Sequence, residues 1–433
     1  MGARPHPANP RYFADATGAP VYLSGIHTWS DFATDQGESR FDYPGFLRSM
    51  ADLDLNLFRG WVWDLPRSRQ GPNGGPFRFR PSPWRRTGPG LATDGEPRFD
   101  LGAWDEAYFE RVRIRTQQAA ELGIYVAIML FQGYGWQFDR AADDGFAYDG
   151  RNNINGVDCG PGADAFTLEH PEVVAVQEAY AAHVADAVAG LPNVLFEIAN
   201  EAGPSSTAWQ YHHIRRLREH LRRHGRHEPV GMTFQFDGGT LAALEQSTAD
   251  WISPDCDPVT RAEPPVADGR AVIVYDSDHG YDWRSLRRDG PAGYRSWLWR
   301  TFCRGAHALL MDPWLARIEI EGEVRNAPLG VDPDDPRFGL RPDPFWEPYR
   351  IAHGVMRGSS RPRSTRRDTP RMTPWATRYG SQNGSARRPN RGSSGFTPTG
   401  ALRTSPSITM RASQGSISSA FAPRQKVRQS HDR

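Results

Sequence analysis

Short β-rich runs that alternate with helical stretches constrain this chain more than any other feature. Eight such runs lie between about Arg11 and Met356, and three of them, Ile124–Phe131, Asn193–Ala199 and Ala271–Tyr275, are almost continuously apolar. Runs of this kind are typical of strands buried on both faces, as in a parallel sheet. The other predicted strands are Val21–Gly25, Leu55–Gly60, Val230–Phe236, Trp251–Ser253 and Ala308–Met311.

Helical stretches separate most of these strands. They are predicted over Tyr43–Leu53, Glu106–Leu122, Glu172–Ala189, Ala208–Arg223 and Tyr294–Arg304. Eight strands mostly separated by helices favour a closed (β/α)8 TIM barrel over an open doubly wound sheet. No GxGxxG or GxxxxGK[ST] motif follows a strand, which argues against nucleotide-binding folds. Long loops are predicted at Asp64–Gly102 and Gln132–Phe166.

The composition changes beyond Met356. Residues 357–433 hold 16 of the 52 basic residues and two of the 51 acidic ones, so they carry a charge of +14 and the first 356 residues carry −13. We therefore predict a catalytic barrel over 1–356 and a low-complexity basic C-terminal tail over 357–433, either disordered or out of frame. A basic arm for nucleic acid or membrane is the other interpretation of the tail. The acidic barrel argues against nucleic acid as its own ligand.

The rest of the composition excludes several classes. No apolar run reaches the roughly 18 residues of a membrane helix. The start of the chain lacks the apolar core of a signal peptide, so we expect a cytoplasmic protein, or a secreted one if the start is misassigned. Three cysteines without CxxC spacing fit neither a disulfide framework nor a zinc ribbon. No cofactor is expected, and the oligomeric state stays open.

The sharpest chemical signal is the pair Asn200-Glu201, which ends the apolar run from Asn193. The carboxyl ends of barrel strands are where catalytic side chains project. A half-desolvated Glu201 would have a raised pKa and would protonate a leaving oxygen, while the Asn200 amide suits a sugar hydroxyl. The alternative for Glu201 is a cap of the following helix.

The second signal is Asp276-Ser-Asp278-His279, directly after the predicted seventh strand. With Glu201 after the fourth strand, Asp276 would face it across the barrel mouth, the arrangement that glycoside hydrolysis needs. Turn capping by Asp276 or Asp278, with His279 orienting it, is one alternative. A divalent metal bound by Asp276, Asp278 and His279 is another.

Other strand ends carry residues suited to a sugar site. Aromatic rings would stack on sugar faces, polar groups would meet hydroxyls, and Arg59 would also hold the nucleophile ionised. The candidates are His27, Trp29, Arg59, Trp61, Trp136, Asp312 and Trp314. Burial in the core is the alternative for Trp29 and Trp61. The pair His212-His213 is expected on a helix surface, and the stretch from Arg215 to Arg226 on a solvated face.

These motifs resemble clan A of the (β/α)8 glycosidases, the cellulase-like superfamily. The opening Asn9-Pro-Arg-Tyr-Phe-Ala-Asp and the later NVLFEIANE, Asp276-Ser-Asp-His and Met311-Asp-Pro resemble the apiosidase-like (DUF4038) and related bacterial glycoside hydrolases over about residues 7–356.

The resemblance implies that Glu201 is the acid/base and that Asp276 stands where the clan places its nucleophile. Asp276 departs from the clan's usual Glu and is one methylene shorter, so retention and inversion both stay open. Asp278 is the alternative second carboxylate. The expected partner is an oligosaccharide or glycoside, and the non-enzymatic alternative is a carbohydrate-binding barrel.

Overall fold

The computed structural model describes residues 3–27, 40–41, 43–52, 54–68, 77–133, 145–160, 163–236, 238–254, 266–276, 296–311, 316–320 and 323–327. The chain divides into two units, Met1–Ser364 and Thr365–Arg433, and all the described residues belong to the first. Within these residues, no helix is both long and apolar enough to cross a membrane.

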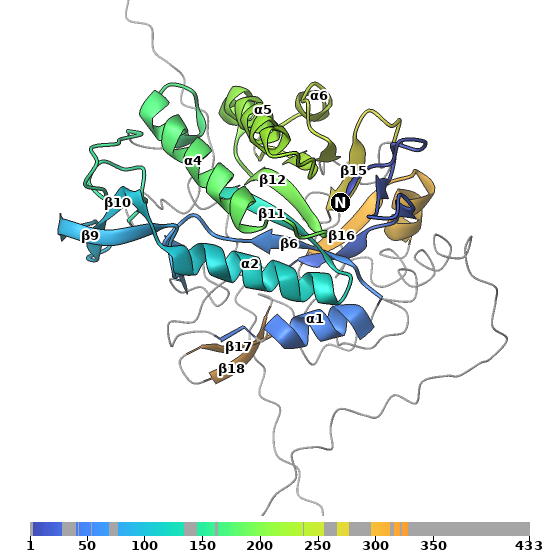
Figure 1. Cartoon of the computed structure of the whole chain (residues 1–433), viewed down its shortest axis with the longest axis horizontal. Coiled ribbons are helices and arrows are strands. Elements are labelled where there is room, and N and C mark those ends of the chain that lie inside the picture. The colour runs from blue at the N-terminus through green and yellow to red at the C-terminus, as the bar shows by residue number, and fades with distance from the viewer. Residues whose placement is uncertain are drawn as a thin grey trace, which may run out of the picture. The chain divides into compact units, whose positions relative to one another are not determined.

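Eight parallel strands close into a barrel, as the alternating pattern predicts (Figure 1). Around the barrel they are β4 (Ser24–His27), β6 (Leu57–Trp61), β11 (Tyr125–Gln132), β12 (Val194–Asn200), β13 (Val230–Thr233), β14 (Trp251–Ser253), β15 (Val272–Asp276) and β16 (His307–Met311). Strand β16 pairs with β4 and closes the ring. The predicted (β/α)8 fold is therefore confirmed.

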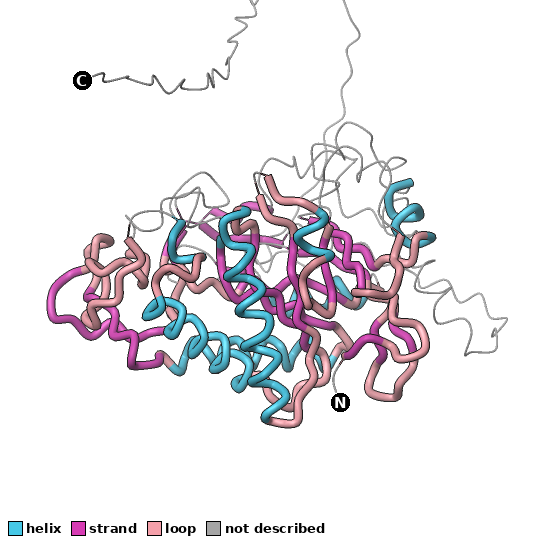
Figure 2. The backbone as a smooth tube through the Cα atoms, turned by 90° about the horizontal axis from the view of Figure 1, so that it is seen from above, coloured by secondary structure: helices cyan, strands magenta, loops and turns pink. Residues whose placement is uncertain are grey.

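Helices pack outside the strands, as the tube view from above also shows (Figure 2). They are α1 (Tyr43–Asp52), α2 (Glu106–Glu121), α4 (Pro171–Ala187), α5 (Thr207–Arg223) and the short α6 (Leu241–Glu245), and residues 296–303 are also helical. The Asp105 carboxylate caps the start of α2, and Gly123 follows its end with a φ of 72°. Short 3-10 turns, η2 (Ala163–Phe166) and η3 (Pro204–Ser206), precede α4 and α5.

The barrel interior is filled by large apolar side chains below the strand ends. Leu57, Leu195 and Trp251 belong to this buried cluster. The Trp251 indole donates to the Phe196 carbonyl at 3.1 Å, and a Cβ on Gly231 would lie 2.0 Å from the ring. Gly231 is therefore required by its neighbour, because any side chain there would displace the indole from the core.

Smaller strands lie outside the barrel. They are β1 (Arg4–Pro5), β2 (Phe13–Ala14) and β3 (Pro20–Val21) in one sheet, β5 (Arg40–Phe41), β17 (Ala316–Ile320) and β18 (Glu323–Ala327) in another, and the pairs β7 (Arg67–Ser68) with β8 (Phe77–Arg78) and β9 (Trp84–Leu91) with β10 (Pro97–Trp104). Two sequence expectations are corrected. The first barrel strand starts at Ser24, since Val21 pairs with Phe13 outside the barrel. The segment Asp64–Gly102 contains β9 and most of β10, which pair as a long hairpin, as well as loops.

Candidate active site

The candidate site lies where β6, β11, β12 and β15 end. Parallel barrel strands bring their carboxyl ends to one face, which is the face that carries catalysis in barrel enzymes. The polar side chains gathered there are Arg59, Gln132, Asn200, Glu201 and Asp276. Strand register aligns Gln132 with Asn200, so both strands end level with each other.

Arg59 is the centre of this cluster and is 2% exposed. Its Nη1 donates to Asp276 Oδ2 at 2.9 Å, and its Nη2 donates to Asn200 Oδ1 at 2.9 Å. Its Nε donates to Glu197 Oε2 at 2.8 Å, and Nη2 also pairs with Glu197 Oε1. One buried guanidinium thereby joins strands β6, β12 and β15 and stabilises two carboxylates.

Glu197 lies one layer deeper than Glu201 and is fully buried within the barrel. Besides its two contacts with Arg59, the Thr233 hydroxyl is 3.1 Å from its Oε1. A buried carboxylate is costly unless it is paired and hydrogen-bonded, and both conditions are met here. Glu197 was not among the predicted site residues. Two features of the sequence would have identified it. One is a Glu inside an otherwise apolar strand, and the other is an Arg inside the strand two positions away in the barrel.

A second line of hydrogen bonds supports the Asn200 amide. Asn200 Nδ2 donates to Gln132 Oε1 at 3.1 Å, and the Gln132 backbone N–H donates to Asp64 Oδ1 at 3.0 Å. Asp64 is buried, and its Oδ2 has no hydrogen-bond partner among the described residues. Burial raises the pKa of Asp64 to about 7, although the backbone donors lower it.

Glu201 follows strand β12 in the left-handed backbone region, with a φ of 48°. Non-glycine residues adopt this conformation at some cost, and such positions often occur at functional sites. Burial raises the pKa of Glu201 to about 7; the Arg59 guanidinium lowers it and the Asp276 carboxylate raises it. Glu201 and Asp276 are therefore close enough to interact electrostatically.

The described residues place several predicted site residues together and leave others untested. Arg59, Asn200, Glu201 and Asp276 meet at the strand ends. The side chain of His27 lies outside the described residues, although its backbone forms part of β4. The candidates that lie outside the described residues altogether are Trp29, Trp136, Asp278, His279, Asp312 and Trp314.

Trp61 is 4% exposed and packs against Trp63, Phe79 and Met129. Its ring centroid is 5.7 Å from the Arg59 guanidinium carbon. The Trp63 and Phe79 rings stack at 3.7 Å between centroids. These rings therefore form a packed wall beside Arg59. The burial of Trp61 agrees with the alternative that it is a core residue.

His213 corrects one sequence expectation. It is 1% exposed rather than on the surface, and its ring lies 4.5 Å from Trp209 and 5.3 Å from Phe131 between centroids. Burial lowers the pKa of His213 to about 3, so the ring is neutral. Its neighbour His212 is half-buried and contacts Glu178. The spacing of Trp209, His213 and Leu217 places all three on the buried face of α5.

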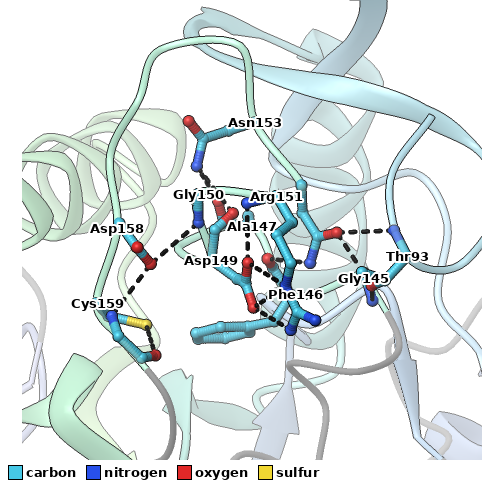
Figure 3. Close-up of polar contacts among 12 residues, drawn as sticks. Thr93, Gly145, Phe146, Ala147, Asp149, Gly150, Arg151, Asn153, Asp158 and Cys159 are labelled. Atoms are coloured by element: carbon cyan, nitrogen blue, oxygen red, sulfur yellow. Dashed lines mark hydrogen bonds and ion pairs between the residues drawn. The ribbon is translucent and has the colours of Figure 1, made fainter. Parts of the chain in front are cut away.

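The segment after β11 packs on the β9–β10 hairpin. Asn153 Nδ2 donates to the carbonyls of Ala147 and Asp149 at 3.0 and 3.1 Å, and Asp158 accepts from Gly150 N at 3.1 Å (Figure 3). Asn153 Nδ2 also donates to the Val157 carbonyl at 2.7 Å. The Asn152 carbonyl accepts from Phe99 N of β10 at 2.8 Å. These bonds tie this segment to the hairpin at the end of the barrel where the strands finish.

A cavity of about 280 Å³ lies beside the hairpin and contains none of the clustered acids. Its lining includes Arg80 and Arg86, which pair with Glu96 and Asp94 respectively. The Arg59 cluster, and not this cavity, is the candidate site, because the carboxyl groups whose charges interact lie at the strand ends.

Solved structures share this fold. A glycoside hydrolase family 5 mannosidase from Rhizomucor miehei, a glutamate-to-alanine mutant in complex with mannosyl-fructose, matches with a TM-score of 0.52 at 13% identity, covering 82% of this chain and 99% of that one. Another glutamate-to-alanine mutant of that mannosidase matches with a TM-score of 0.51 at 12% identity and the same coverage. At these identities the likeness is one of fold: this chain shares its barrel with these two structures. Neither a scan of family models nor a search of curated proteins gives a match.

Proposed function

We propose that this barrel is a glycoside hydrolase that cleaves an O-glycosidic bond with two carboxyl groups, Glu201 and Asp276. One observation carries the proposal: where the barrel strands end, a buried arginine holds the Asp276 carboxylate at 2.9 Å, and Glu201 follows strand β12 at the same end. Burial raises the pKa of Glu201 to about 7, which agrees with this arrangement. Two carboxyl groups in unequal environments are the means by which glycosidases divide acid and base roles.

Glu201 is the proton donor in this proposal. Its raised pKa keeps a large fraction protonated near neutral pH, which a general acid requires. Protonation of the glycosidic oxygen lets the leaving group depart as an alcohol. The left-handed backbone at Glu201 turns the chain at the end of β12 and supports a functional role for this residue.

Asp276 is the second carboxylate. Arg59 donates to its Oδ2 at 2.9 Å and keeps the carboxylate in place at the strand end. In this proposal the carboxylate attacks the anomeric carbon or accepts a proton from water. Retention of the anomeric configuration would assign Asp276 as a nucleophile, and inversion would assign it as a base. Asp278 is the alternative to Asp276, and the Asp276→Asn and Asp278→Asn variants distinguish them.

A metal-dependent hydrolase centred on Asp276, Asp278 and His279 is the competing enzyme class. The guanidinium at 2.9 Å from Asp276 argues against it, because a divalent cation and Arg59 would compete for one carboxylate. Activity that persists after chelation supports the glycosidase, whereas activity that chelator removes and metal restores supports the alternative.

The proposed substrate class depends on the side chains predicted at the ends of the barrel strands. We infer an oligosaccharide or glycoside, contacted by Asn200, Arg59 and the predicted aromatic and polar rim residues. Mannosides head the panel of trial substrates because the structural neighbour described above is a mannosidase. Placement within the apiosidase-like group rests on the sequence motifs alone, as does the proposal of a catalytic domain over 1–356.

The experiment is reducing-sugar release by the full-length chain from a panel of plant and bacterial glycans. Release by the wild type that is lost in Glu201→Gln supports the proposal. Saturable tryptophan-fluorescence changes without release would support a carbohydrate-binding barrel instead. Release that is undiminished in Glu201→Gln would remove this residue from the mechanism.

A further inference from the structure

Helices α4 and α5 make the same histidine–carboxylate contact twice, at two successive levels along their length. His212 Nε2 is 2.6 Å from Glu178 Oε1, and His220 Nε2 is 2.8 Å from Asp186 Oδ1. The carboxylates are eight residues apart on α4, and the histidines are eight residues apart on α5. The helices run in the same direction and in register, because each follows a parallel barrel strand.

The two levels differ four residues further along α5. At the first level Arg216 follows His212 by one turn, and its Nε donates to Glu178 Oε2 at 2.9 Å. At the second level His224 takes the equivalent position after His220. The carboxylate of Glu178 is therefore hydrogen-bonded by an arginine at 2.9 Å. The carboxylate of Asp186 faces two imidazoles and has Arg226 at the longer distance of 3.8 Å.

The second level has the geometry of a metal site. One ligand atom from each of Asp186, His220 and His224 lies within 4.8 Å of the others. Zinc–nitrogen and zinc–oxygen bonds of about 2.0–2.2 Å allow one ion to bridge atoms at such separations after small side-chain shifts. His224 Nδ1 is 2.9 Å from its own helix's His220 carbonyl, so Nδ1 carries the proton and Nε2 keeps its lone pair. Metal-ligating histidines are commonly oriented in this way.

We propose that Asp186, His220 and His224 bind one Zn²⁺ or a similar divalent transition-metal ion. The site is exposed at Asp186 and His224, so an ion enters without rearrangement of the core. The negative end of the α5 dipole lies nearby and favours a cation. Arg226 Nη1 is 3.8 Å from Asp186 Oδ1, but this arginine also binds Glu228 at 2.7 Å.

The location assigns the ion a structural role. Helices α4 and α5 end here, just before strands β12 and β13 begin, so the site lies at the end of the barrel opposite Glu201. Features at that end of a barrel contribute to stability rather than catalysis. A bound ion would link the two helices that flank the strand carrying Asn200.

Calorimetric titration of the metal-free full-length protein with ZnCl₂ at pH 7.5 tests the proposal. Thermal unfolding and the absorption spectrum of a Co²⁺-loaded sample are measured alongside. We expect one tight site and a higher Tm with Zn²⁺. His224→Arg copies the first level and is expected to weaken binding at least about tenfold, as is His220→Ala.

His212→Ala is the matched control, since it removes a histidine–carboxylate contact between the same helices without touching the proposed ligands. It is expected to keep wild-type zinc affinity. Zinc binding that survives His224→Arg but is lost in Asp276→Asn would overturn the proposal and place the ion at the catalytic end. No saturable binding at pH 7.5 would also overturn it.

Discussion

Glu197 lies inside β12, and Glu201 lies four residues later, just after the strand ends. The same Glu→Gln substitution is predicted to change stability in opposite directions at these two positions. The physical reason is their different pairing. Glu197 is a carboxylate bound twice by Arg59, whereas Glu201 carries a raised pKa because burial disfavours its charged form.

The effect at Glu201 follows from proton linkage. Its pKa rises from 4.5 to about 7, so the folded state retains this proton where the unfolded state has lost it. The stability of the folded state therefore falls as pH rises from about 4.5 to about 7. At about 1.4 kcal/mol per pKa unit the full penalty is about 3 kcal/mol above pH 7. Glu201→Gln removes the ionisation, so it is expected to stabilise the protein by about this amount at pH 8 and little at pH 4.

The effect at Glu197 has the other sign. Removal of one partner from a buried ion pair costs roughly 3–5 kcal/mol, because it leaves a charge without compensation. Arg59 keeps Asp276 and Asn200 as acceptors, so the lower end, about 3 kcal/mol, is expected for Glu197→Gln. The new side chain would also place an amide NH2 group against the guanidinium N–H groups. Both groups are hydrogen-bond donors, so no hydrogen bond can form between them.

Equilibrium urea unfolding, followed by tryptophan fluorescence at pH 8 and pH 5, measures both effects. The prediction is that the midpoint rises for Glu201→Gln and falls for Glu197→Gln at pH 8. The gain at Glu201 should shrink at pH 5. Destabilisation of both variants, or a gain at Glu201 that does not depend on pH, would refute the electrostatic reasoning.

Three further predictions concern Asp64, Gly231 and the pH dependence of activity. The pKa of Asp64 rises from 3.8 to about 7, so ionisation of this side chain destabilises the folded state at high pH. Asp64→Asn removes that ionisation, and its stabilising effect is expected to be about 4 kcal/mol larger at pH 8 than at pH 3. Equilibrium unfolding at both pH values checks this. Gly231→Ala should destabilise the protein by about 3 kcal/mol, because the new Cβ would overlap the Trp251 ring. A Tm within about 2 °C of the wild type, which corresponds to roughly 0.5 kcal/mol, would contradict this prediction. The kcat/KM of the proposed glycosidase activity should fall above about pH 7 as Glu201 ionises. A flat profile up to pH 9 would exclude Glu201 as the acid.

The barrel strands could be predicted from sequence because continuous burial leaves a readable apolar run. Asn200, Glu201 and Asp276 could be placed at one face for the same reason, since all three directly end such runs. The β9–β10 hairpin was not predicted, because its exposed strands contain Gly-Pro-Gly and many charges, which are typical of loops. Its strands are stabilised by pairing with each other and with the loop after β11, contacts that no local pattern records.

The interior charges show the other limit of the sequence. Glu197 lies within a strand that reads as apolar, and only the closed barrel brings Arg59 onto it. His213 was assigned to the surface because it adjoins another histidine in a basic helix. Its actual neighbours, Trp209 and Phe131, come from packing of α5 on the barrel.

The central claim is that Glu201 supplies a proton and Asp276 supplies the second carboxylate. The most direct test is kcat/KM on aryl glycosides of the sugar identified by the panel, with leaving groups of high and low pKa. A phenol of low pKa departs without protonation, so the need for a general acid disappears.

For Glu201→Gln we expect a loss on the order of 10²–10⁴-fold with the poor leaving group and little loss with the good one. Asp276→Asn should lose turnover with both, while Glu219→Gln and Asp268→Asn, the same changes at exposed positions, should match the wild type. Equal losses for Glu201→Gln with both leaving groups, or wild-type turnover in Asp276→Asn, would contradict the account.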